Sequence, residues 1–236
     1  MLKPKKKITR KEIKKDPVLE KISQAEHFLR EKHKPVLYAT IAVVLVIVLS
    51  IALIHSKINA NREASGELGI AEMALAANDV DNAIVQLEAL IDKNPKTKSA
   101  GMATILLAQA YLSKDNLESA EVYYRKYIDD YTDDDMLTAT AYNGLGACAE
   151  RHAEYAQAAK YFEKGGDVSS HEFLKCDSYL NAVRAYLKLK NIEKAEKLLN
   201  AIPRNNLDYR KRSLVETFAA ELEVLRSEIN WFAIVG

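Results

Sequence analysis

The chain has 236 residues, of which 48% are hydrophobic and 28% are charged, a composition typical of a globular protein and not of a disordered one. Eight Gly and five Pro exclude a collagenous chain, and two Cys cannot form the disulfide framework of a small secreted domain. The net charge of +1 hides two unequal parts. Residues 1–34 hold twelve Lys and Arg against five Asp and Glu, a net charge of +7, and the remaining residues hold 22 against 28, a net charge of −6.

Residues 1–34 are predicted to form a basic arm that ends in an amphipathic helix. Lysines and arginines crowd residues 3–15, and Asp16 before Pro17 is typical of a helix start. Apolar residues then recur at helical spacing, at Val18, Ile22, Ala25 and Leu29. The basic run is either a topology signal alone or also a contact for anionic lipid, at about 1 kcal/mol per basic residue near the surface. Aromatic side chains do not alternate with the charges, so we expect no nucleic-acid binding.

Residues 35–56 are predicted to form one transmembrane helix. The stretch contains no Asp, Glu, Lys or Arg, and its nineteen residues Val36–Ile54 are almost wholly apolar. At the rise of an α-helix they cover roughly 28 Å, close to the hydrocarbon thickness of a bilayer. Only a helix satisfies its own backbone groups in that environment.

A cleavable signal peptide is the alternative to a retained anchor. Ser50-Ile51-Ala52 offers the small-x-small pattern of a cleavage site. The basic region before the apolar run would however be 34 residues long, and the run continues past the cut, so we favour the anchor. Lys and Arg are concentrated before the helix, which predicts a cytoplasmic N-terminus. Residues 57–236 would then be exported, which in a bacterium means a single-pass inner-membrane protein with a periplasmic domain.

Four segments of residues 57–236 repeat one pattern. They align on Ala83, Ala120, Ala158 and Ala195, at intervals of 37, 38 and 37 residues, and each follows another helical stretch. The pattern resembles the tetratricopeptide repeat (TPR), in which small residues let two helices of a hairpin approach closely and bulky residues fill the space between hairpins. The residues that carry the resemblance are Leu107, Leu145 and Gly146 in the first helices, Tyr124 and Phe162 in the second, and Pro95 at the end of the first repeat.

The resemblance implies an all-α fold. We expect one N-terminal transmembrane helix, an α-solenoid of about four TPR-like hairpins, and a C-terminal helix that caps the last hairpin. The capping helix would bury one apolar side, formed by Leu214, Val215, Phe218, Leu222 and Leu225. The apolar tail, residues 229–236, either packs back on the array or contacts a partner, and packing is favoured.

The resemblance also implies a partner-binding groove, lined by the first helix of each hairpin. The groove positions are occupied by Leu68, Glu72, Leu75, Met102, Ile105, Gln109, Leu112, Asn143, Glu150, Arg151, Asp177, Leu180, Arg184, Leu187 and Lys188. The groove would be apolar in its early part and polar to basic in its late part, which suits a peptide with an apolar segment and an acidic end. The alternative is that some of these residues only seal a tightly wound array.

No motif for catalysis, a cofactor or a metal is found, because the sequence lacks a Gly-rich phosphate loop, HExxH and Cys-x-x-Cys. The acidic residues within 129–135 lack the spacing of a calcium loop, and we expect a solvated loop whose later aspartates cap the helix that begins near Met136. Cys148 and Cys176 fall near opposite ends of adjacent parallel helices in the repeat frame, so both are predicted to be free thiols.

The order of the three parts resembles the ancillary subunit of the SecYEG translocon, a single-span bacterial family with periplasmic repeats. This resemblance implies a non-enzymatic scaffold whose partners are translocon subunits, periplasmic chaperones or client polypeptides. The alternative is a structural component that coordinates cell division or outer-membrane assembly through the same groove. A cytosolic import receptor would need the opposite topology, which the charge asymmetry disfavours.

Overall fold

The fold was analysed in a computed structural model that describes residues 21–23, 26–27, 30, 33–204 and 207–235, with residues 33 and 229–235 described as backbone only. These residues form helices and turns but no β-strand, which confirms the predicted all-α class within the described part of the chain. The chain divides into two compact units, Met1–Ile58 and Asn59–Gly236. The predicted amphipathic helix of the arm lies largely outside the described residues and stays a prediction.

The first long helix, α3 (His33–Ala76), contains the apolar stretch. Among the described residues it is the one helix that is long and apolar enough to cross a membrane, with a mean hydropathy of 2.9 in its most apolar part. Its apolar side chains between residues 37 and 54 are largely exposed. Two hydroxyl groups within the stretch, those of Thr40 and Ser50, donate to the carbonyl groups of Val36 and Val46, 2.9 and 2.7 Å away. These two hydroxyl groups are therefore satisfied within the helix itself, an arrangement compatible with an apolar environment.

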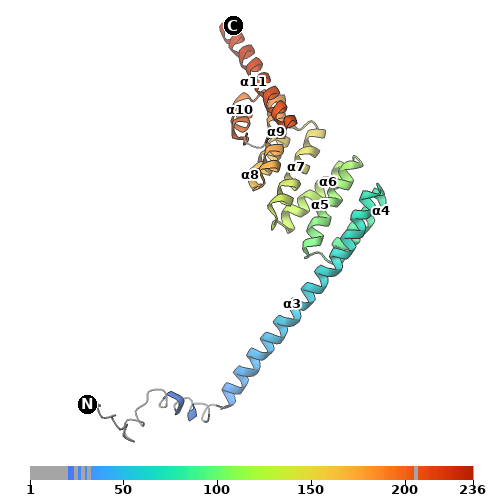
Figure 1. The fold of residues 1–236 in the computed structure, drawn as a ribbon, viewed down its shortest axis with the longest axis vertical. Helices are drawn as coiled ribbons and strands as arrows, with labels where there is room; N and C mark the ends of the chain where they lie inside the picture. The colour runs from blue at the N-terminus through green and yellow to red at the C-terminus, as the bar shows by residue number, and fades with distance from the viewer. Residues whose placement is uncertain (1–20, 24–25, 28–29, 31–32, 205–206, 236) are drawn as a thin grey trace, which may run out of the picture. The chain divides into compact units, whose positions relative to one another are not determined.

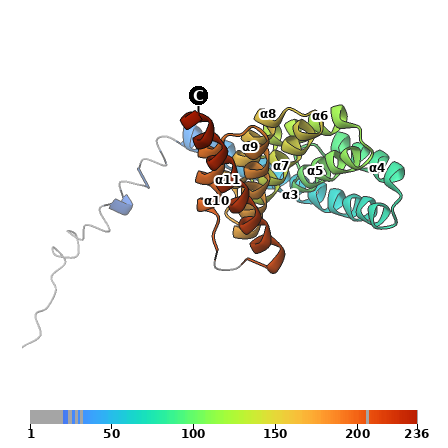
Figure 2. The same ribbon diagram turned by 90° about the horizontal axis from the view of Figure 1, so that it is seen from above.

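The second unit is an array of helix pairs that follow one another in chain order, from α4 at one end to α10 and α11 at the other (Figures 1 and 2). The end of α3 pairs with α4 to form the first hairpin, and three more hairpins and a final long helix follow. Their bounds are α4 (Val80–Lys93), α5 (Lys98–Ser113), α6 (Leu117–Asp130), α7 (Asp135–Arg151), α8 (Tyr155–Val168), α9 (Glu172–Lys188), α10 (Ile192–Ala201) and α11 (Tyr209–Val235). The prediction of four hairpins and a capping helix is confirmed.

Each hairpin turns at the same repeat position. The turn residues Asn78, Asp115, Ala153 and Lys190 all have a φ of 54 to 60°, the left-handed region that most side chains avoid. The residue after each turn is the N-cap of the second helix, and in three hairpins its side chain accepts a hydrogen bond from a backbone N–H of the first turn. In the third hairpin the N-cap is Glu154, which makes no such bond. The same left-handed turn conformation thus reverses the chain in all four hairpins, and an N-cap hydrogen bond accompanies it in three of them.

Glycines allow aromatic rings to pack against the helices of the array. A Cβ on Gly146 of α7 would lie 2.6 Å from two ring carbons of Phe162 in α8, inside van der Waals contact. The same close approach occurs between Gly144 and the ring of Tyr124. These contacts explain why the TPR pattern places a small residue opposite a large one.

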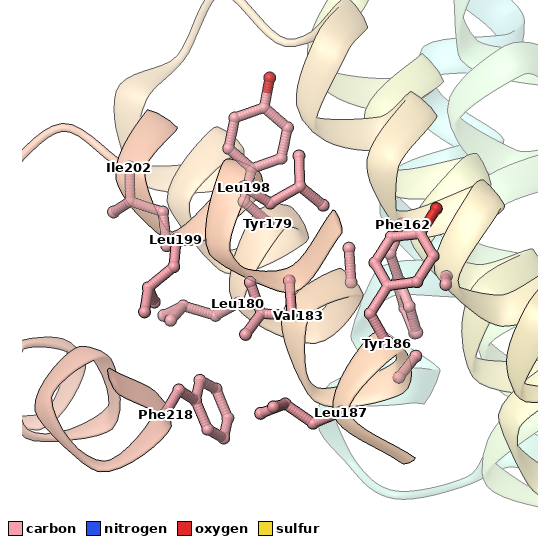
Figure 3. Packing of buried hydrophobic residues seen from close by; sticks show 14 of the residues in the cluster. Phe162, Tyr179, Leu180, Val183, Tyr186, Leu187, Leu198, Leu199, Ile202 and Phe218 are labelled. Atoms are coloured by element: carbon pink, nitrogen blue, oxygen red, sulfur yellow. The ribbon is translucent and has the colours of Figure 1, made fainter. Parts of the chain in front are cut away.

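The C-terminal helix α11 packs on the last hairpin. Val215, Phe218 and Leu222 are buried in the same core cluster as Leu180, Val183 and Leu187 of α9 and Leu198 and Leu199 of α10. Figure 3 shows the ring of Phe218 pointing towards Leu187. Leu225 is partly buried against this core, whereas Leu214 is exposed and takes no part in it, because it lies off the packed side of the helix. The side chains of the apolar tail lie outside the described residues, so its packing stays a prediction.

The two cysteines are free and buried, as the repeat frame predicts. Burial raises the pKa of the Cys148 thiol to about 11, which keeps it protonated and unreactive at neutral pH. The acidic segment between α6 and α7 also forms as predicted, because Asp134 is the N-cap of α7 and accepts a hydrogen bond from the backbone N–H of Leu137, 3.0 Å away.

Candidate partner-binding groove

The first helices of consecutive hairpins lie next to one another and carry the predicted groove positions. Helices α5 and α7 are in contact, as are α7 and α9, and α9 and α11. The end of α3 joins this row through Ser65, whose hydroxyl lies 3.0 Å from that of Ser99 in α5. We call the surface that carries the predicted groove positions of α3, α5, α7 and α9 the inner face.

The apolar residues of the predicted groove are mostly part of the core. Ile105, Leu180 and Leu187 are buried, so little of their surface is left for a partner. Leu68 and Leu75 are partly buried against the core of the first two hairpins, and Leu112 against the next core cluster. Met102 is half-buried, and of the apolar groove positions predicted in α5 it is the one that the core clusters do not include.

Two polar pairs connect α7 to α9 across the inner face. The guanidinium of Arg184 donates twice to the carboxylate of Glu150, at 3.0 and 2.8 Å. Asn143 donates to the hydroxyl of Ser178 at 2.8 Å. A two-point Arg–carboxylate pair fixes the angle between its helices more firmly than a single contact does. Arg184 is therefore less available to an acidic partner than the sequence alone indicates.

Two of the remaining charged positions, Arg151 and Asp177, are also paired. Arg151 of α7 donates to the carbonyl of Leu112 at 3.1 Å and to the carboxylate of Asp115 at 2.7 Å. Asp177 of α9 pairs with Lys211 of α11 at 2.7 Å, and Lys211 is itself buried. These bonds join α7 to the end of α5 and its following turn, and α9 to the capping helix α11, so the polar residues of the inner face also hold the array together.

The exposed positions of the predicted set are Glu72, Gln109, Arg151 and Lys188. They come from four successive first helices, and their charge changes along the array from negative at Glu72, through neutral at Gln109, to positive at Arg151 and Lys188. With each arginine paired to a carboxylate, the late part of the inner face is more nearly neutral than its sequence indicates. Among the described residues, no group of three His, Cys, Asp or Glu side chains is arranged to hold a metal ion.

Sequence reasoning missed a second type of junction between repeats. The hydroxyl of Tyr111 in α5 donates to Glu88 of α4 at 2.7 Å, and that of Tyr186 in α9 donates to Glu163 of α8 at the same distance. In both pairs the tyrosine follows the glutamate by 23 residues, a spacing that was visible in the sequence. The bond to Glu88, with burial, raises the pKa of Tyr111 to about 12.

The comparisons with known proteins agree with this geometry. A family model described as a tetratricopeptide repeat-like domain matches residues 26–174. Among solved structures, nearly identical TPR-like repeats attributed to a kinesin light chain of Podosopora anserina are 16% identical, with a TM-score of 0.51 over 71% of this chain and 94% of that one. BtubC (BKLC) from P. vanneervenii is 12% identical, with a TM-score of 0.51 over 77% of this chain and 86% of that one. These structures are similar in fold alone.

Among curated proteins, none matches the sequence. The family model covers both the apolar part of α3 and the first three hairpins, which is more than half of the chain. Helical hairpins of this type serve as scaffolds for protein–protein interaction. The chain belongs to the tetratricopeptide repeat-like domain family.

Proposed function

We propose that the protein is a membrane-anchored scaffold without catalytic activity, which holds a protein partner on the inner face of its repeats. The observation that carries this proposal is the direct connection of a TPR-like array to α3, a helix long and apolar enough to span a membrane. The exposed residues Glu72, Gln109, Arg151 and Lys188 would contact the partner first. Met102, which is half-buried on the inner face, would supply an apolar contact.

We place this scaffold in the bacterial inner membrane, with residues 57–236 in the periplasm. The charge difference supports this topology, since the arm carries +7 and the exported part would carry −6. The order of basic arm, single span and repeats supports a place beside the Sec translocon, where the partner is a translocon subunit, a periplasmic chaperone or a client polypeptide. The arm would add contacts to anionic lipid on the cytoplasmic side.

Photocrosslinking in intact membranes tests the proposal. A photoreactive amino acid replaces Lys188 on the inner face, and in a matched control it replaces Lys160, an exposed lysine of the second helix α8. We expect cross-links to a defined protein from position 188 and none from position 160. Recovery of translocon subunits or chaperones supports a role in export, and recovery of division or outer-membrane factors alone supports the alternative. Equal labelling from both positions contradicts a partner on the inner face.

A further inference from the structure

The first repeat differs from the others because apolar side chains of its first helix are exposed away from the inner face. At one equivalent position of the four repeats, the seventh in the TPR pattern, Ile70 is 58% exposed, whereas Leu107, Leu145 and Ala182 are 0%, 2% and 0% exposed. Three residues later, Met73 is 73% exposed, whereas its equivalents Ala110, Cys148 and Ala185 are buried. The same side of α3 thus remains open where the later repeats are covered.

The cover in the later repeats is always the second helix of the preceding hairpin. In the core between the second and third hairpins, Tyr124 and Tyr127 of α6 pack with Leu145 and Cys148 of α7. Between the first and second hairpins, the cover consists of Leu87, Leu90 and Ile91 of α4. Each covering helix therefore presents large apolar side chains three or four residues apart. No hairpin precedes α3 within the described residues.

The uncovered side, which we call the end face, consists of Gly66, Ile70 and Met73 of α3 with Gln86 and Ala89 of α4. It borders a shallow pocket of about 470 Å³ that Glu67, Leu90 and Lys93 also line. A Cβ on Gly66 would have no atom within 4 Å, so a helix can approach closely there. The side-chain carbonyl of Gln86 is buried and accepts no hydrogen bond from any described residue. A donor on the incoming helix would satisfy it.

Charge indicates what kind of helix would fit. Residues 59–93, which contain the first hairpin of the second unit, hold seven acidic and two basic residues, a net charge of −5. Glu72 of this set belongs to the inner face and Glu88 to the junction with α5, so the charge at the end face itself comes from Glu63 and Glu67 beside Lys93. At the rim, Glu63 and Glu67 share the single ammonium group of Lys93, at 2.7 and 2.8 Å. A second copy of this chain would bring the same negative charge to a symmetric contact, which disfavours self-association through this face. The complementary occupant is a basic helix.

We propose that the end face docks a basic amphipathic helix of another protein, in the place that the second helix of a preceding hairpin would take. Its apolar side would cover Ile70 and Met73 as α6 covers α7. Its basic side would meet the acidic rim of the first hairpin. This inference concerns a surface separate from the inner face and does not depend on the proposed function.

Methyl NMR of the full chain in detergent micelles tests the proposal, because methionines report each surface separately. Met73 lies on the end face, Met102 on the inner face and Met136 at the start of α7. The probes are two 18-residue helical peptides with one leucine stripe, one carrying lysines and the other glutamates on the polar side. We expect the lysine peptide to shift the Met73 resonance and to leave those of Met102 and Met136 in place. The glutamate peptide should leave Met73 unmoved.

Two substitutions sharpen the result. Ile70→Ser should weaken binding of the lysine peptide at least about fivefold, since it removes most of the apolar area of one anchor. Val122→Ser, at a similarly exposed valine of α6, is the matched control and should leave binding unchanged. The proposal is overturned if the Met73 resonance does not shift with the lysine peptide or shifts equally with both peptides. It is also overturned if Met73 shifts with protein concentration alone, because a second copy would then occupy the face.

Discussion

Gly146→Ala is the substitution that tests the packing of the array most sharply. The new methyl group would lie 2.6 Å from two ring carbons of Phe162, and an ordinary carbon–carbon contact needs about 3.5 Å, so the ring must withdraw by about 0.9 Å. Phe162 is only 2% exposed, so the ring has no free space to enter. Overpacking of this kind costs about 1–3 kcal/mol. Alanine is favoured over glycine within a helix by about 1 kcal/mol, so the net loss of stability is up to about 2 kcal/mol.

Gly66→Ala is the matched control, since its methyl group would meet nothing within 4 Å. It should stabilise the protein by about 1 kcal/mol through helix propensity alone. The difference between the two variants is therefore the overpacking cost, about 1–3 kcal/mol, or roughly 2–12 °C in the midpoint of thermal unfolding. Circular dichroism of the full chain in detergent measures both midpoints. Equal midpoints for the two variants would refute the close approach of α7 and α8.

Three further predictions concern the turns and the junctions. Ala153→Gly should raise the free energy of unfolding by about 1 kcal/mol in denaturant titrations, because the left-handed turn is strained for alanine, and Ala159→Gly, inside α8, should lower it. Glu154→Asn should raise the free energy of unfolding by about 1 kcal/mol, because it supplies the side-chain cap that α8 lacks. An unchanged free energy of unfolding would show that the turn already satisfies the backbone N–H groups at the start of the helix. Tyr111→Phe should lower the free energy of unfolding by about 1 kcal/mol at neutral pH. It should also reduce the stability that the protein loses at alkaline pH. That loss is expected between pH 10 and 12, because the unfolded tyrosine releases its proton there while the folded one, with its raised pKa, keeps it.

The repeat alignment predicted the fold well because the packing positions depend only on local rules. Ala83, Ala120, Ala158 and Ala195 are all fully buried, as close contact between paired helices requires. The turns were found less directly, because Asn78, Asp115, Ala153 and Lys190 share a backbone conformation and not a residue type. Side-chain identity could not reveal that shared φ.

The groove stays a prediction, and the repeat positions alone could not show which of its residues bond to neighbouring side chains. Arg184 and Arg151 stand at groove positions, but Arg184 pairs with Glu150 of the adjacent helix α7, and Arg151 pairs with Asp115 in the turn that follows α5. Ile105 stands at a groove position as well, yet it is buried in the core that α6 and α7 complete. Ile70 is the opposite case, since its repeat position indicates burial, yet it is exposed and no hairpin precedes it within the part of the chain that the structure describes.

The central claim is that an anchored chain presents its repeats outside the membrane. Both native cysteines are buried, so a membrane-impermeant maleimide should report on one introduced thiol at a time with little background. In cells with a permeabilised outer membrane, the account predicts that Lys188→Cys is labelled without lysis and that Lys14→Cys is labelled only after lysis. Labelling of Lys14→Cys without lysis, with Lys188→Cys protected until the cells are broken, would contradict it.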